Sequence, residues 1–363
     1  MRLFQNSAVY PAYASRHRYG YRATPTFLAQ SACFLEHRYG ALHFLAPVLS
    51  GDSTAFFTNG DDEELQRAWA HEMGMPAKAS LVDILLAQVE SHRTEVFYNL
   101  DPVRYGNGFV HKLPGCVRKT VAWRAAPSPG ADFGEYDLLV CNFPSLLRNY
   151  QEQGWRAEYF APAHDPVMDE YVSNRERAID VLFVGGYSRH HSRRAAVLKA
   201  VAGLRSRYRI EFCLGRSRLT RLAESVAGFF PLMGRHQRSS AVRAVSREPV
   251  YGRDLYALIS RSKIVLNGAI DMSGQDRGNM RCFEAMGCAA LLLSDAGLYP
   301  TGMQDGKTLL AYSSPSQARE LVERVLTDWS CYQEVARRAH RMVRALYSKE
   351  HQWREFQRLV SRL

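Results

Sequence analysis

Long hydrophobic runs are missing from this 363-residue sequence. A helix that spans a bilayer needs about 20 consecutive apolar residues. The strongest apolar run, AALLL at 289–293, is far shorter and suits a buried strand. The N-terminus, MRLFQNS, carries no long apolar segment of the kind found in a secretory signal. We therefore expect a protein that neither crosses a membrane nor is secreted.

Cysteine is scarce and shows no pattern. The seven cysteines are an odd number, and none of them forms a C-x-x-C motif. A disulfide framework and a thiolate metal site are therefore not expected, and a reducing cytoplasm is the expected location. Short-period repeats and low-complexity segments are also missing, whereas the apolar fraction of 46% can fill packed cores.

Acidic residues are outnumbered, and the formal net charge is +11. Such a balance attracts phosphorylated substrates, anionic lipid headgroups or nucleic acid. Arginines cluster at 189–194, 235–247 and 337–354, the last with the spacing of a solvated helix face. Peripheral contact with an anionic membrane, at its inner face, stays open. No nucleic acid is expected as a partner, because the first cluster has only Tyr187 beside it for base stacking.

Apolar runs alternate with helical patterns along the chain. Strands are expected at 2–6, Ala55–Asn59, 95–99, Lys119–Trp123, 136–141, 179–184, 209–214, 263–267, 289–294 and 308–312. Helices are expected at 25–35, 62–71, Leu81–Ser91, 144–154, 191–204, 254–262, Met280–Gly287, 315–326, 332–346 and 350–363. Near-continuous apolar strands separated by helices indicate parallel sheets covered on both faces.

A polar, irregular stretch with two prolines, at 161–175, is typical of a linker. We therefore expect an α/β protein with an N-terminal domain at 1–165 and a C-terminal domain at 176–346. For the last helix, at 347–363, packing back against the N-terminal domain stays open. Ligands of such sheets bind at the carboxyl ends of the strands, so the cleft between the two domains is the expected site.

The densest polar constellation lies at 267–295. A buried strand is expected to end at Asn267, and after a polar loop a helix is expected to begin near Asn279. The side chain of Asn279 can cap this helix. The helix N-terminus favours an anion such as a diphosphate, and Arg277 and Arg281 can add charge-assisted hydrogen bonds.

Glu284 follows within the same expected helix. A carboxylate there can accept hydrogen bonds from both hydroxyls of a ribose, as carboxylates do in other nucleotide sites. Arg281 and Glu284 stand three residues apart, so a surface ion pair is the alternative. A polar loop between two buried strands lies at the ligand end of a sheet, which favours the binding interpretation.

A second cluster, GGYSRHHSRR, spans 185–194. A turn at Gly185 and Gly186 would let the backbone approach a phosphate, and Arg194 would add a charge. The alternative is an ordinary solvated helix start. The two histidines of this segment are adjacent rather than four residues apart, so they do not predict a metal pair.

The segment 279–295 resembles the donor-binding core of glycosyltransferases from the group-1-like, CgeB-related branch of the GT-B superfamily. That pattern runs N-x-R-x-F-E-A-x-G-C-G-A-L-L-L-[ST]-D, and this chain reads NMRCFEAMGCAALLLSD, with Ala289 in place of a glycine. Further parts of the chain resemble the same donor domain or the end of the acceptor domain: 180–186, 256–267, 305–312, 317–326, 136–154 and 160–165.

This resemblance implies the GT-B architecture, two Rossmann-like domains that face each other across a cleft. It implies transfer of a sugar from a nucleoside diphosphate sugar to a glycan, lipid-linked or protein acceptor, as in polysaccharide biosynthesis. It also implies a donor site in the second half of the chain. That site comprises Gly185, Gly186, Arg194, Asn267, Asp276, Arg277, Asn279, Arg281 and Glu284.

Within that site, the resemblance puts Glu284 on the ribose, and Arg281 at the leaving diphosphate as a catalytic group. Fixed cations there stabilise the transition state more than the ground state. Many retaining relatives carry two glutamates eight positions apart, and here the first position is Asp276, which leaves the stereochemistry open. No D-x-D motif is present, so neither a metal nor a cofactor besides the donor is expected.

The first half of the chain offers two candidates for a catalytic base, should the reaction invert configuration. Asp101 follows an expected strand, and His17 lies in a loop rich in arginine and tyrosine. An ordinary surface or core role is the alternative for both. Three other activities also stay open for the chain: a nucleotide-sugar epimerase of GT-B shape, a basic nucleic-acid-binding protein, and a degenerate transferase that acts as a scaffold.

Overall fold

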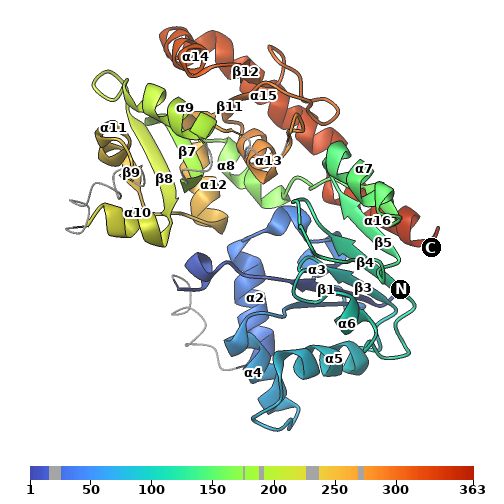
Figure 1. Ribbon diagram of the computed structural model, residues 1–363. Helices are drawn as coiled ribbons and strands as arrows, with labels where there is room; N and C mark the ends of the chain where they lie inside the picture. The colour runs from blue at the N-terminus through green and yellow to red at the C-terminus, as the bar shows by residue number, and fades with distance from the viewer. Residues whose placement is uncertain (16–25, 175, 188–191, 226–236, 269–273) are drawn as a thin grey trace. The chain divides into compact units, whose positions relative to one another are not determined.

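The computed structural model describes residues 1–15, 26–174, 176–187, 192–225, 237–268 and 274–363. The chain forms two compact units (Figure 1). The first unit comprises Met1–Pro162 and Lys349–Leu363, and the second comprises Ala163–Ser348. The second unit is therefore inserted into the first, and both ends of the chain belong to the first unit.

The first unit is built on a parallel sheet with the strand order β2-β1-β3-β4-β5-β6 among the described residues. Its strands are β1 (Leu3–Ser7), β2 (Ala55–Asn59), β3 (Val96–Asn99), β4 (Lys119–Trp123), β5 (Leu138–Cys141) and β6 (Ala157–Tyr159). Its helices are α2 (Phe27–His37), α3 (Ala46–Leu49), α4 (Glu63–Glu72), α5 (Leu81–Ser91), α6 (Asn107–Val110), α7 (Pro144–Glu152) and α16 (Lys349–Val360), with a 3-10 turn, η1, at Ala41–His43.

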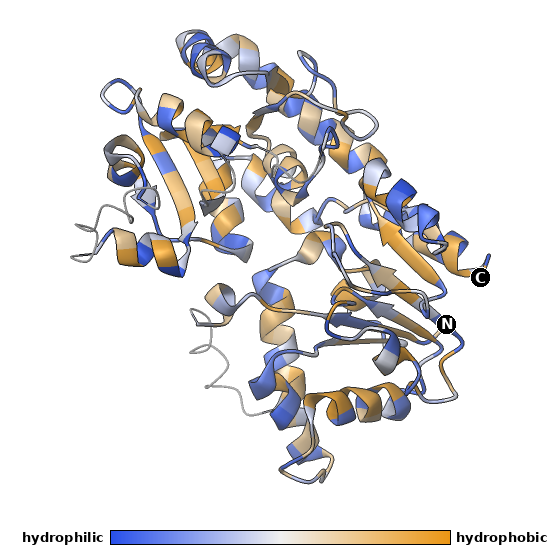
Figure 2. Ribbon diagram, viewed as in Figure 1, coloured by the Kyte–Doolittle hydropathy of each residue, from blue (hydrophilic) through white to orange (hydrophobic). Residues whose placement is uncertain are grey.

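Helices cover both faces of this first sheet. Phe4 of β1 faces the core that α5 completes with Leu85. Phe57 of β2 points to the other face, where its ring stacks 5.6 Å from that of Phe34 in α2. The nearly unbroken burial of the strands follows from this double cover, and Figure 2 shows the strands as largely hydrophobic.

The second unit repeats this plan with the strand order β12-β11-β10-β7-β8-β9, again all parallel. Its strands are β7 (Ile179–Tyr187), β8 (Ile210–Arg216), β9 (Ser246–Arg247), β10 (Ser262–Leu266), β11 (Leu291–Asp295) and β12 (Leu310–Tyr312). Its helices are α8 (Asp169–Val172), α9 (Ser192–Ala202), α10 (Arg218–Ala223), α11 (Ser240–Ala244), α12 (Gly252–Ser260), α13 (Met280–Gly287), α14 (Pro315–Thr327) and α15 (Trp329–Leu346), with a 3-10 turn, η2, at Pro166–Met168.

The expected turn at Gly185 and Gly186 is wrong. β7 continues to Tyr187, and both glycines pair in register with β8, Gly185 with Leu214 and Gly186 with Gly215. The long partner strand β8 supplies backbone hydrogen-bonding groups as far as Arg216, so the chain stays extended where the glycines alone suggested a bend. The residues that follow, 188–191, lie outside the described residues.

Part of the expected linker at 161–175 has regular structure, and its residues 163–174 belong to the second unit. Its residues include η2 and α8, and Asp165 has no exposed surface. The Asp165 side chain accepts a hydrogen bond from the backbone N–H of Val167, and the hydroxyl of Tyr256 lies 3.3 Å from its Oδ2 atom. Burial with these partners explains why a polar stretch can be ordered.

The last helix, α16, is anchored in the first unit by a buried lysine. Lys349 is 3% exposed, and its Nζ atom donates to the carbonyl oxygens of Ala41 and Phe44, both at 2.7 Å. Phe356 of the same helix packs its ring 5.0 Å from Tyr98 of β3. Among the described residues no helix has the length and apolar character that a bilayer crossing requires.

Candidate functional site

The strand order of the second sheet contains a switch point between β7 and β10. From β7 the chain moves outward to β8 and β9, and then returns to place β10 on the other side of β7. The connections after β7 and β10 therefore leave the sheet in opposite directions. In open parallel sheets, ligands bind in the crevice that this creates outside the carboxyl ends of the strands.

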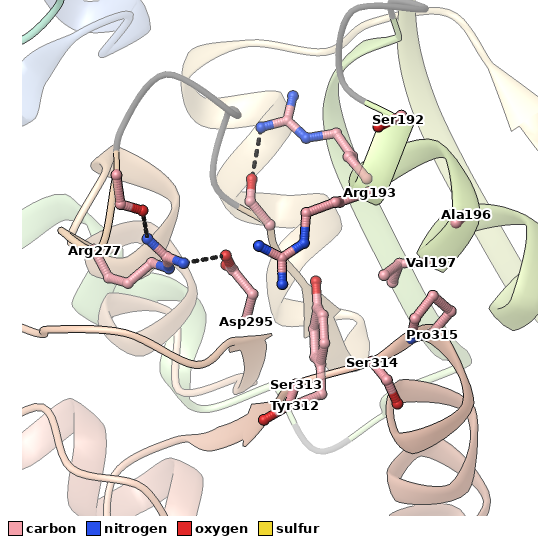
Figure 3. A pocket seen from close by; sticks show the side chains of 13 residues that line it. Ser192, Arg193, Ala196, Val197, Arg277, Asp295, Tyr312, Ser313, Ser314 and Pro315 are labelled. Atoms are coloured by element: carbon pink, nitrogen blue, oxygen red, sulfur yellow. Dashed lines mark hydrogen bonds and ion pairs between the residues drawn. The ribbon is translucent and has the colours of Figure 1, made fainter.

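A cavity of about 370 Å³ lies at these carboxyl ends (Figure 3). Its walls come from the start of α9, the chain after β10, the end of β11, and the turn from β12 into α14. The lining residues are Ser192, Arg193, Arg194, Ala196, Val197, Gly268, Gly274, Arg277, Asp295, Tyr312, Ser313, Ser314 and Pro315. Three of them are arginines and one is an aspartate, so the cavity suits an anion.

Arg277 is fastened to protein groups on one wall of this cavity. Its Nη1 atom donates to the carbonyl oxygens of Gly274, at 3.0 Å, and Asp276, at 2.9 Å. Its Nη2 atom donates to the carbonyl oxygen of Ala296, at 2.9 Å, and lies 2.8 Å from the Asp295 carboxylate. Arg277 thus ties the chain after β10 to the end of β11 and neutralises the only acidic group named in the lining.

Arg194 holds the opposite wall. Its Nη2 atom donates to the carbonyl oxygen of Gly268 at 2.6 Å, and its Nη1 atom contacts the carbonyl oxygen of Gly186 at 3.4 Å. The guanidinium also lies 5.9 Å from the centre of the Phe183 ring. Arg194 therefore links the first turn of α9 to the ends of β7 and β10.

Asn267 joins three elements immediately after β10. Its Nδ2 atom donates to the Ser294 hydroxyl at 3.1 Å, and its Oδ1 atom accepts from Asn279 Nδ2 at 3.3 Å. Its backbone oxygen accepts a hydrogen bond of 2.6 Å from the buried hydroxyl of Tyr312. Burial raises the pKa of Tyr312, so this phenol stays protonated and keeps donating. Asn267 is a structural junction beneath the cavity.

The expected capping by the side chain of Asn279 is wrong, although α13 does begin where the sequence predicts. Asn279 occupies the N-cap position, but its side chain makes no capping hydrogen bond. The amide is turned towards Asn267 instead. The first N–H groups of α13 are therefore not occupied by this side chain. Nearby, Asp276 is 2% exposed and forms a parallel bridge with Leu298.

Arg281 and Glu284 form an ion pair that is buried rather than on the surface. Arg281 Nη1 lies 2.6 Å from Glu284 Oε2, and the two side chains are 16% and 9% exposed. Burial raises the pKa of Glu284, and the charge of Arg281 opposes that shift. The pair is not aligned as a hydrogen bond, so Glu284 Oε2 and Arg281 Nε and Nη1 have no hydrogen-bond partner among the described residues.

The donor residues expected from the sequence thus fall into two groups. Arg194 and Arg277 line the cavity, whereas Arg281 and Glu284 sit on α13 and do not. The sequence missed Arg193 and Asp295, which line the cavity. Asp295 closes the apolar run AALLLSD, and its position at a strand end was the signal available for it. Groups of three or more residues that could hold a metal ion do not occur among the described residues.

The first sheet brings two carboxylates together at its own carboxyl edge. Asp101 follows β3, where its carboxylate lies 3.3 Å from Arg104 Nε. Asp61 follows β2, and its Oδ1 atom accepts a hydrogen bond of 3.0 Å from the backbone N–H of Val9. Partial burial, together with the nearby charge of Asp101, raises the pKa of Asp61 to about 6. The sequence singled out Asp101 but missed Asp61, and His17 lies outside the described residues.

Comparison with known protein families identifies the family of the segment that contains this site. Residues 192–358 match the family model described as "Glycosyl transferase-like". This segment therefore belongs to a glycosyltransferase-like family, and the chain as a whole has the GT-B architecture. Among curated protein sequences, none matches this chain. The match does not extend to the CgeB-related branch, so membership of that branch stays a prediction.

Solved structures of low sequence identity share the fold of this chain. HepE of Anabaena, solved with UDP and glucose, is 11% identical over 100% of both chains, with a TM-score of 0.61. The sucrose-phosphate synthase of Thermosynechococcus elongatus is 12% identical over 85% of this chain and 80% of its own, with a TM-score of 0.51. An α-glucosyltransferase solved with UDP and a 13-mer DNA is 9% identical over 85% of this chain and 84% of its own, with a TM-score of 0.54.

The matched segment, 192–358, contains every residue named in the cavity lining, from Ser192 to Pro315. It also contains α13 with Arg281 and Glu284. The family match, the switch point in the strand order and the arginine-lined cavity therefore all lie at the carboxyl edge of the second sheet.

Proposed function

We propose that this protein is a glycosyltransferase that takes its sugar from a nucleoside diphosphate sugar held at the carboxyl edge of the second sheet. The observation that carries the proposal is the arginine-lined cavity at the switch point between β7 and β10. A diphosphate there would meet a positive field from the arginines and from the N-terminus of α9. UDP is the first nucleotide to test, since the Anabaena protein of the same fold was solved with it.

In the transfer, an acceptor oxygen bonds to the anomeric carbon while the bond from that carbon to the diphosphate breaks. Negative charge grows on the leaving diphosphate, and the acceptor hydroxyl gives up its proton. Fixed guanidinium groups stabilise that growing charge without having to reorganise during the reaction. We therefore propose that the chemistry proceeds without a divalent metal ion, and that it has the same turnover in buffer with and without EDTA.

Glu284 is the proposed partner of the ribose. Its buried Oε2 atom has no hydrogen-bond partner among the described residues, and buried polar atoms in proteins are nearly always paired. Two ribose hydroxyls are donors that a carboxylate can accept. Arg281 would then hold the carboxylate in its ionised form, since its charge counteracts the effect of burial on the pKa of Glu284.

The acceptor is proposed to bind in the first unit, and a glycan, a lipid-linked saccharide and a protein are the acceptors to compare. The carboxyl edge of the first sheet, with Asp61 and Asp101, is the corresponding position of that unit. His17 remains a second candidate for a base. We also propose a cytoplasmic location for the protein. Its arginine clusters would allow peripheral contact with an anionic membrane.

Calorimetric titration with UDP, ADP, GDP and UDP-glucose tests the function. The wild-type protein is expected to bind at least one of them, and binding of none would overturn the proposal. Glu284→Gln is expected to weaken UDP binding about tenfold or more, because a hydrogen bond to a charged group is worth about 1.5–3 kcal/mol. Its affinity for inorganic pyrophosphate, which lacks a ribose, should change little.

A nucleotide without one hydroxyl provides the control for Glu284. 2′-Deoxy-UDP should bind the wild type more weakly than UDP, and Glu284→Gln should no longer distinguish the two. Glu320→Gln, on the exposed surface of α14, removes the same charge away from the site and should leave both affinities unaltered. If Glu284→Gln still prefers UDP over 2′-deoxy-UDP as strongly as the wild type, Glu284 does not contact the ribose.

A further inference from the structure

We infer that Arg193 is the side chain that receives the diphosphate of the donor, and that Arg194 and Arg277 are positioning residues that hold the walls of the cavity. This inference rests on the proposed function and deepens it. It differs from the expectation from sequence, which assigned the phosphate contacts to Arg194, Arg277 and Arg281. What separates the arginines is which of their N–H groups are already engaged by the protein.

Arg277 has little left to offer a ligand. A guanidinium carries five N–H donors, and Arg277 directs both terminal nitrogens to the carbonyl oxygens of Gly274, Asp276 and Ala296 and to the carboxylate of Asp295. The side chain is 9% exposed. A phosphate could reach it only by displacing contacts that hold the chain after β10 against β11.

Arg194 is engaged in a similar way. Its terminal nitrogens contact the carbonyl oxygens of Gly268 and Gly186, which belong to the ends of two different strands. This guanidinium therefore fixes the distance between α9 and the switch point. Its charge still adds to the field in the cavity, but its geometry is set by the protein.

Arg193 is different from both. It lies in the first turn of α9, it is exposed, and it has no hydrogen bond or ion pair with any residue that the structure describes. Figure 3 shows its guanidinium directed into the cavity, above Tyr312 and across from the pair of Arg277 and Asp295. A free, correctly placed cation at the N-terminus of an eleven-residue helix is well suited to a bidentate contact with a phosphate.

The charges around Arg193 favour an anion at that point. Asp295, the acidic residue of the lining, is neutralised by Arg277 at 2.8 Å. Both signs of charge act on the pKa of Tyr312, which Asp295 raises further and which Arg194, Arg277 and Arg193 lower. The lining carries three guanidinium groups against one carboxylate, and among its described residues Arg193 is the cation without a hydrogen bond or ion pair to the protein.

Binding measurements on matched variants test the assignment. Arg193→Gln is expected to weaken both UDP and inorganic pyrophosphate about tenfold or more, because a charge-assisted hydrogen bond is lost. Its melting temperature should equal that of the wild type, since no described contact is broken. Arg193→Lys should recover part of the affinity. Arg205→Gln, an equal charge change on an exposed residue beyond the other end of α9, should bind like the wild type.

The positioning residues should behave differently from Arg193. Arg194→Gln and Arg277→Gln should lower the melting temperature, because contacts that hold the cavity walls are lost. Their KM for the donor should rise more than their kcat falls, because donor bound at saturating concentration stabilises the native arrangement of these walls. Arg193→Gln should lose kcat as well, since charge on the leaving group is no longer stabilised. Wild-type UDP affinity in Arg193→Gln overturns the inference, as does loss of binding in Arg277→Gln at an unchanged melting temperature. Failure of the wild type to bind any nucleoside diphosphate counts instead against the proposed function.

Discussion

Among single residues, the arginines of the site differ in their hydrogen bonds and ion pairs with the protein, whereas their charge is the same. Arg194 and Arg277, which the sequence pattern assigned to donor binding, both line the cavity. The pattern could not reveal that Arg194 is held by Gly268, because that carbonyl lies 74 positions further along the chain. Arg193 has the same charge and stands next to Arg194, so only the direction of its side chain sets it apart. Directions of side chains follow from tertiary packing, which a local pattern does not contain.

Ala289 stands at a position where the sequence departs from the pattern of the family that it resembles. The related pattern has glycine there, and this chain adopts a φ of 52° at Ala289. That conformation is in the left-handed region, which costs a residue with a Cβ atom about 1–2 kcal/mol. Glycine has no Cβ atom and adopts this conformation without that cost, which explains the glycine of the pattern. In this protein the strain lies at Ala289, between α13 and β11.

The carboxyl group of Asp61 should make stability depend on pH. Its pKa of about 6 in the folded protein is above its ordinary value of 3.8, so the folded state binds its proton more tightly than the unfolded chain does. Stability contributed by the protonated form is therefore lost as pH rises from about 4 to 6. Asp61→Asn keeps an acceptor for Val9 and should raise the free energy of unfolding by about 1 kcal/mol at pH 8, after allowance for solvent screening.

Urea unfolding at pH 4 and pH 8 measures this effect. The gain from Asp61→Asn should be much smaller near pH 4, where the wild-type carboxyl is protonated in the folded state and about half protonated in the unfolded chain. Asp52→Asn is a control of opposite sign, because hydrogen bonds from Thr54 lower the pKa of Asp52 and the substitution should destabilise at pH 8. An Asp61→Asn gain of equal size at both pH values would mean that charge is not its cause.

For helices and strands, periodic and apolar segments were predictable and short polar ones were not. The sequence gives the bounds of α13, α5, β2 and β4 correctly. It missed α10 and α11, which are six and five residues long, because so short a helix leaves no periodic apolar pattern. The overrun of β7 past Gly185 depends on pairing with β8, which is again a tertiary effect.

The C-terminal end of α13 is predicted to tolerate no side chain. A Cβ atom on Gly287 would lie 2.2 Å from the Sδ atom of Met168 and 3.1 Å from Nδ1 of His164, both fully or nearly buried. Gly287→Ala should therefore destabilise the protein by about 1–3 kcal/mol, even though alanine favours a helix by about 1 kcal/mol. Chemical unfolding with urea provides the measurement.

Gly108 supplies the matched control for this substitution. It also lies in a helix, α6, but a Cβ atom there meets nothing within 4 Å. Gly108→Ala should be neutral or slightly stabilising. Equal effects of the two substitutions would show that helix propensity, and not the contact with Met168, controls the stability at Gly287.

In the molecule as a whole, the first unit depends on a segment that the chain reaches last. Lys349 donates to the carbonyl oxygens of Ala41, Leu42 and Phe44 from a site that is 3% exposed. Lys349→Met should lower the free energy of unfolding by about 2–4 kcal/mol, because three buried carbonyls lose a donor and each such loss is costly. Lys112→Met, an exposed residue of the same unit, should change it little. Unfolding monitored by tryptophan fluorescence distinguishes the two variants.

The division of the molecule at Pro162 and Lys349 also determines the order in which a ribosome can finish it. Ala163–Ser348 emerges as one uninterrupted stretch and can fold as soon as it is made, whereas the earlier 162 residues must wait for the final helix. Until then the carbonyls at 41–44 and the ring of Tyr98 lack the partners that α16 brings them. During synthesis, the unit whose residues are made first is therefore the one completed last.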